Sequence, residues 1–99
     1  MPKGYAVFTE DVKDPAGLQA YAAKAVPTVL AYGGKPLIAG SPAHNLEGEW
    51  HGQQTVMIEF ESVEAAKAWY NSDDYQAVVG KRLAATEGYS VISQSMNMG

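Results

Sequence analysis

The segment TVMIEFESVEAAKAWYNSDDYQAVVGKR, residues 55–82, most constrains what this chain can fold into. In its first six residues Val56, Ile58 and Phe60 fall at every second position, which is typical of a strand with a buried face. Ser62 and Ser72 then each precede an amphipathic stretch, in the position where a hydroxyl caps a helix. The segment therefore predicts a buried strand that leads directly into two short helices.

The N-terminal third predicts a longer helix. Asp14 and Pro15 are a capping residue followed by a proline at the first helical position. Apolar residues follow at three- and four-residue intervals, and Pro27 lies inside the stretch. Gly33 and Gly34 predict the helix end, because glycine readily takes the left-handed conformation found there.

Three more strands complete the predicted order. The second strand is expected to end at Gly40 or, alternatively, to continue toward Leu46 past a bulge at Ser41 and Pro42, where proline is tolerated. The last strand is expected after Gly88, and residues 96–99 are expected to fray. The resulting class is α+β, a ferredoxin-like β-α-β-β-α-β sandwich with a four-stranded antiparallel sheet and helices on one face. The four strands are predicted over residues 3–11, 35–40, 53–60 and 89–96.

Size and charge exclude several classes of protein. A chain of 99 residues, 46% of them hydrophobic, predicts a single domain over residues 1–99. Seven basic against eleven acidic residues, a net charge of -4, give no basic surface for nucleic acid. Without cysteine there is no thiol nucleophile, disulfide or thiolate metal site. No apolar run approaches the ~18 residues of a membrane span, so a cytoplasmic protein is expected.

The strand over residues 53–60 predicts an assembly. One of its faces is apolar and suited to helices, whereas the other, which carries Thr55, Met57 and Glu59, should be polar if it met only water. We expect this second face to be partly apolar and to pack against the same face of a second copy, as a homodimer. Its apolar members are expected to be Met57, Val7 or Phe8, and Val91 or Ile92.

Motifs spread over nearly the whole chain carry a family resemblance. They are YGG at residues 32–34, LEG at 46–48, EF-x-S at 59–62, A-x-x-WY-x-S at 66–72 and Y-x6-R at 75–82. In these motifs the chain resembles the uncharacterised family called domain of unknown function 1330, of the dimeric α/β-barrel superfamily. The resemblance implies a ferredoxin-like monomer and a barrel made from two sheets. That superfamily contains monooxygenases, isomerases, haem-degrading enzymes and proteins without assigned activity, so the function stays open.

Arg82 is the centre of the candidate ligand pocket. It follows Tyr75 by seven residues, which places a permanent cation beside the apolar stripe of the last helix. We expect Glu59 to be its carboxylate partner, with Tyr75 and Tyr70 as hydroxyl partners. Such an arrangement would line a pocket for a small polar or anionic ligand, and its alternative is a structural salt bridge between helix and sheet.

Two further groups are weaker candidates. Tyr5, Tyr32 and Trp69 form either an aromatic pocket wall or ordinary core and interface contacts. The connection between the two middle strands carries imidazoles and carboxylates, but their spacing matches no metal motif, so no metal site is expected. His51 of this connection is a candidate for a general base, because imidazole titrates near neutral pH. The imidazoles and carboxylates of the connection are His44, Glu47, Glu49 and His51.

Three functions are consistent with this pattern. The first is a small-molecule binding protein, or an enzyme without a tightly bound cofactor, whose pocket lies between the sheet and the helices. The second is a ligand-sensing module with no turnover. The third is a structural dimer.

Overall fold

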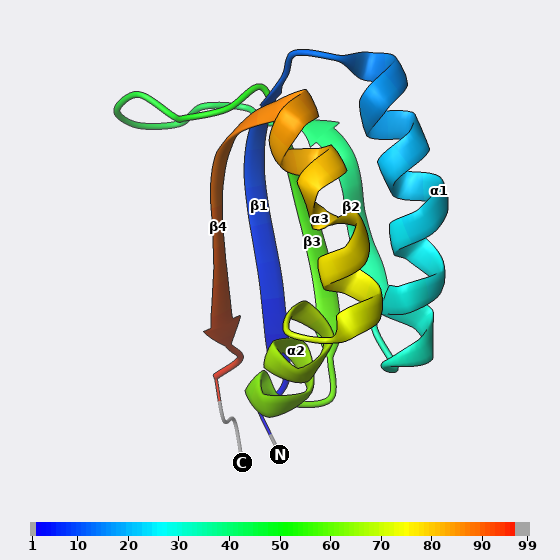
Figure 1. Ribbon diagram of the computed structural model, residues 1–99. Helices are drawn as coiled ribbons and strands as arrows, with labels where there is room; N and C mark the ends of the chain where they lie inside the picture. Colours follow the sequence, from blue (N-terminus) through cyan, green and yellow to red (C-terminus); the bar gives the residue numbers. More distant parts are fainter. Residues whose placement is uncertain (1, 97–99) are drawn as a thin grey trace.

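The computed structural model describes residues 2–96 and has the predicted order of elements, with the second helical segment divided in two (Figure 1). Residues 97–99, part of the predicted frayed tail, lie outside the described residues. Among the described residues no helix is both long and apolar enough to cross a membrane. The elements are β1 (Gly4–Val12), α1 (Pro15–Ala31), β2 (Lys35–Pro42), β3 (Gln54–Phe60), α2 (Val63–Tyr70), α3 (Asp73–Ala85) and β4 (Thr86–Gln94).

The four strands form one antiparallel sheet in the order β2-β3-β1-β4. This order confirms the ferredoxin-like α+β class. The three helices lie on one face of the sheet, with α1 and α3 packed side by side (Figure 1). We call the face under the helices the inner face and the opposite one the outer face.

The predicted helix boundaries are confirmed by their capping bonds. The Asp14 carboxylate accepts a hydrogen bond from the Gly17 amide at 3.1 Å, at the start of α1. Ser62 and Ser72 cap α2 and α3 in the same way, at 3.0 and 3.2 Å. Gly33, with φ of 76°, follows the end of α1 in the left-handed conformation. Local side-chain chemistry thus sets where each helix begins and where the longest one ends.

Strand alternation decides which side chains meet the helices. Phe8 of β1 and Phe60 of β3 point to the inner face, where both pack against the ring of Trp69 from α2. Trp69 in turn contacts the Tyr75 ring of α3, with 4.2 Å between ring centroids. These four side chains are almost completely buried and form the centre of the hydrophobic core.

The outer face is also partly apolar, as predicted. Val7 of β1 lies opposite Met57 of β3 on one side and Val91 of β4 on the other. The sequence left open whether Val7 or Phe8, and whether Val91 or Ile92, lies on this face. Val7 and Val91 do, whereas Phe8 and Ile92 belong to the inner face. Val91 is 56% exposed, so the described chain leaves more than half of its surface uncovered.

Two details of the predicted strands are wrong. β2 ends at Pro42, between the two predicted ends, and its register shifts lie between Pro36 and Ile38 and between Ala39 and Ser41, earlier than the predicted bulge. β4 begins at Thr86 rather than Tyr89, directly after α3.

Gly88 accounts for the second error, because it lies inside β4 rather than at a turn before it. A Cβ atom built there would clash with the backbone of Thr9 and Glu10 in β1. The glycine therefore allows the two strands to approach closely, and it does not mark the end of an element.

Gly88→Ala is expected to destabilise the protein. The added methyl group would force β4 away from β1, and overpacking of this kind costs about 1–3 kcal/mol of unfolding free energy. Gly80→Ala is the matched control, because the Gly80 position in α3 is open and alanine favours a helix by about 0.5–1 kcal/mol. Urea unfolding followed by circular dichroism measures both, and equal stability of the two variants would contradict this account of β4.

Candidate functional site

A cavity of about 200 Å³ lies between α1 and the inner face of the sheet. Its walls are almost entirely apolar, because small and branched side chains of α1 face the alternate residues of β1 and β3. Tyr21, Gln54 and Arg82 are the polar residues among those that line it, and we call them the polar end of the cavity. Its apolar walls include Leu18, Ala25 and Val29 from α1, and Phe8, Val56 and Ile58 from the sheet.

Arg82 occupies the last turn of α3 and is only 8% exposed. Its guanidinium carbon lies 5.0 Å from the centre of the Phe8 ring, in a cation–π arrangement. Its Nε donates to the Tyr75 hydroxyl oxygen at 3.3 Å, a contact that the seven-residue spacing along α3 makes possible. The predicted proximity of Arg82 and Tyr75 is thus present, with the cation on the cavity wall.

Tyr75 and Tyr21 join α3 to α1 through their hydroxyl groups, which lie 2.8 Å apart. Burial, together with Tyr75, raises the pKa of Tyr21 well above its ordinary value, so this phenol stays neutral at physiological pH. Burial alone would lower the pKa of Arg82, but Tyr75, Tyr21 and Glu10 outweigh it and the net direction is upward. The polar end therefore presents a fixed cation and a neutral hydroxyl.

Glu10 is the carboxylate near this cation, and the sequence argument missed it. It is 4% exposed, and its Oε1 accepts from Gln54 Nε2 at 3.0 Å. Its Oε2 is the buried side-chain oxygen for which the described residues supply no hydrogen-bond partner. The signal was present, because Glu10 follows Ala6 and Phe8 on the inner face at two-residue intervals.

The predicted ion pair between Arg82 and Glu59 is wrong. Glu59 lies on the outer face, opposite Tyr5 of β1, and its Oε2 accepts from the Tyr5 hydroxyl at 2.9 Å. Ile58 and Phe60 on either side of it face the helices, so alternation directs Glu59 away from them. The sheet thus separates Tyr5 and Glu59 from the cavity.

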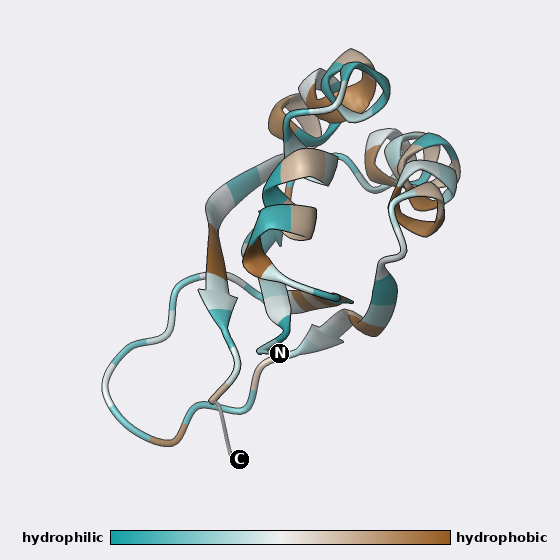
Figure 2. Ribbon diagram, turned by 90° about the horizontal axis from the view of Figure 1, so that it is seen from below, coloured by the Kyte–Doolittle hydropathy of each residue, from teal (hydrophilic) through white to brown (hydrophobic). Residues whose placement is uncertain are grey.

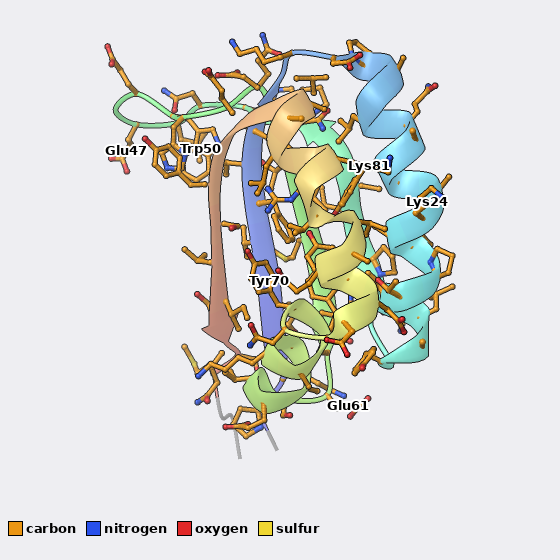
Figure 3. All side chains as sticks on the ribbon, viewed as in Figure 1. Lys24, Glu47, Trp50, Glu61, Tyr70 and Lys81 are labelled. Carbon is orange, nitrogen blue, oxygen red and sulfur yellow. The ribbon has the colours of Figure 1, made fainter. Side chains whose placement is uncertain are left out.

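The other predicted pocket residues are placed as follows. Trp69 is a core residue whose Nε1 donates to Thr28 Oγ1 at 3.0 Å. Tyr70 packs beside Tyr75, between α2 and the sheet (Figure 3), and with Trp69 it lines a separate hollow against β4. Tyr32 follows the end of α1, is 39% exposed and is not among the residues that line the cavity.

The connection between β2 and β3 projects away from the helices, as the positions of Glu47 and Trp50 show (Figure 3). Within residues 2–96 no three His, Cys, Asp or Glu side chains come together as a possible metal site. His51 lies instead against the outer face, with its Nδ1 2.8 Å from Thr9 Oγ1 and its ring between those of Trp50 and Tyr89. It belongs to a shallow hollow on the far side of the sheet from Arg82.

Chemically, the cavity is suited to holding an apolar body and hydrogen-bonding a single polar group. Among the described residues that line it there is no serine, threonine, histidine or lysine, and Tyr21 supplies the hydroxyl. Arg82 is a donor at every physiological pH, and Tyr21 can donate or accept. Among the described lining residues no nucleophile lies beside a base.

Solved structures with a similar fold include a protein of unknown function from Rhodopseudomonas palustris, with a TM-score of 0.78 and 18% identity, covering 97% of this chain and 84% of that one. SnoaB, a cofactor-independent oxygenase from Streptomyces nogalater, has a TM-score of 0.62 and 11% identity, over 99% and 97% of the two chains. A dimeric ferredoxin-like protein of unknown function from Thermobifida fusca has a TM-score of 0.53 and 8% identity, covering 97% of this chain and 92% of that one. At these identities the likeness shows the fold alone.

No curated protein sequence matches the chain. The family match extends over residues 3–96, which is nearly the whole sequence and includes the cavity and the outer face. The chain therefore belongs to the family described as "Domain of unknown function (DUF1330)".

Proposed function

We propose that this protein binds a small molecule with a compact apolar body and one polar or anionic head, without a tightly bound cofactor. The observation that carries the proposal is Arg82, a buried cation on the wall of an otherwise apolar cavity. Burying a guanidinium is costly unless its donors are used, and among residues 2–96 its side-chain hydrogen bond is the one from Nε to Tyr75. A ligand head that accepts from the remaining donors would use them.

The size of the cavity supports a small ligand. An apolar cavity of roughly 150 Å³ can hold benzene, so about 200 Å³ suits a single ring or a short branched chain with a head group. The apolar walls would favour that body through the surface it removes from water. Binding alone would serve a sensing module, and the same step would precede turnover in an enzyme.

Compact aromatic and branched acids and amides are expected to raise the melting temperature of the protein. Ala25→Leu should abolish this effect, because the larger side chain fills the cavity. Arg82→Met should weaken it by removing the head-group donor while keeping an apolar stem against Phe8. A thermal-shift screen with benzoate, phenylacetate, isovalerate and their amides measures all three proteins.

Ala23→Leu is the matched control, since Ala23 is an exposed residue of α1 that does not line the cavity. It should keep the thermal shifts of the wild-type protein. The proposal would be abandoned if no probe shifted the melting temperature, or if Ala25→Leu responded as the wild type does.

We also propose that this chain acts as one domain within a homodimer that forms through the outer face. Val7, Met57 and Val91 lie side by side across three strands there, and Tyr89 is 64% exposed. The connection between β2 and β3 projects on the side away from the helices, with Leu46 94% exposed (Figure 2). Apolar side chains left in water on one face are typical of an association surface.

Two further points bear on the assembly. The structural neighbour from Thermobifida fusca is described as dimeric, which supports the proposal as an analogy of fold. A cytoplasmic location, expected from the sequence, stays a prediction.

Val91→Glu is expected to convert the dimer into a monomer. The new carboxylates would meet across the interface without partners, and desolvating them would cost more than the apolar contact supplies. Leu83→Glu is the control, since Leu83 is similarly exposed, at 61%, but lies on α3 at the other side of the molecule. Sedimentation velocity should show a dimer for the wild type and Leu83→Glu. A monomeric wild type would refute the interface.

A further inference from the structure

The polar end of the cavity holds two opposite charges that do not form an ion pair. Glu10 and Arg82 are both buried and lie near each other, because Glu10 follows Phe8 on the inner face of β1 and the Arg82 guanidinium lies over the Phe8 ring. Yet the salt bridges among residues 2–96 join other partners, Lys3 with Glu61 and Lys13 with Glu87. Glu10 and Arg82 therefore balance each other in charge while each keeps hydrogen-bonding capacity.

The position of Glu10 follows from its neighbours. Its Oε1 accepts from Gln54, whose side chain lines the cavity, so the carboxylate lies behind this part of the wall. Its Oε2 has no partner among the described residues although it is fully buried. A buried carboxylate oxygen without a donor is unfavourable, because desolvation is not offset by a hydrogen bond. Glu10 is not among the described residues that line the cavity, so the polar end offers donors at Arg82 and an acceptor at the side-chain oxygen of Gln54, while Glu10 acts through its charge.

The balance of charge between Glu10 and Arg82 favours a neutral head group on the ligand. A free carboxylate placed at Arg82 would bring a second negative charge into a site that is already neutral, and an unbalanced buried charge costs several kcal/mol. A neutral head of the same shape avoids that cost. If it carries both a carbonyl oxygen and an N–H group, it can accept from the guanidinium and donate to the side-chain oxygen of Gln54 on the cavity wall.

We propose that the cavity selects a neutral head group that both accepts and donates hydrogen bonds, a carboxamide in its simplest form, over a free carboxylate. Arg82 receives the carbonyl oxygen, and Glu10 excludes acids by its charge. Glu10 is therefore a specificity-determining residue. This inference rests on the proposed function, because it describes the head group of the ligand bound in the same cavity.

Phenylacetamide and phenylacetate test the inference, because they share one shape and differ in charge. Isothermal titration calorimetry at pH 7 should show the wild-type protein binding the amide at least tenfold more tightly than the acid. In Glu10→Gln, a replacement of nearly equal shape, the preference should reverse toward the acid, because Arg82 is then an unbalanced cation. Glu64→Gln removes a charge from an exposed position on α2 and should keep the wild-type preference.

The outcomes separate this inference from the proposed function. If wild-type protein binds the acid as tightly as the amide, the inference is overturned and the ligand cavity stands. If Glu10→Gln keeps the wild-type preference, the role of Glu10 is overturned. If neither probe binds, both the inference and the proposed function fall. The wild-type comparison alone decides the first point, even if Glu10→Gln does not fold.

Discussion

The buried guanidinium of Arg82 is the constraint around which the helical layer is arranged. A permanent charge inside a protein is tolerated only where hydrogen bonds and opposite charge replace water. Here the Tyr75 hydroxyl, the Phe8 ring and the nearby Glu10 carboxylate provide that environment. Because these groups come from α3 and β1, the charge fixes how that helix lies over the sheet.

The same network links the two long helices. The hydroxyl of Tyr75 lies between Arg82 and Tyr21, so one phenol joins α3 to α1. Below that contact, the small side chains of α1 leave the cavity open against the sheet. Fold and candidate site are therefore not independent, since the polar contact that orders the helices also forms the polar end of the cavity.

Much of the fold could be predicted because its signals are local. Ser62, Ser72 and Asp14 are capping residues whose effect depends on neighbours within three positions. Alternation identified the strands and also the apolar character of the outer face. The start of β4 was mistaken because Gly88 is required by close contact with β1, a partner nearly eighty residues away in the sequence. No local pattern distinguishes such a glycine from one in a turn.

The candidate site was predicted only in part, for a similar reason. Arg82 and Tyr75 were found because both lie on one helix at a spacing that brings them together. Glu59 was chosen as the partner of Arg82, although the alternation of side chains along each strand already favours Glu10. Glu59 lies between core residues and so points to the outer face, whereas Glu10 follows the core residues of β1 at two-residue intervals and points to the inner face. The cavity itself depends on the distance between α1 and the sheet, which tertiary packing sets and sequence periodicity does not reveal.

Arg82 is the only arginine in the chain, so its side-chain NH signal tests the central claim directly. In an ¹⁵N-edited NMR spectrum at pH 7, burial over Phe8 and the bond to Tyr75 predict one Nε–H signal, shifted by the ring and exchanging slowly with solvent. That signal should move when phenylacetamide is added. A signal with the position and rapid exchange of a free arginine, unmoved by the probe, would contradict the account.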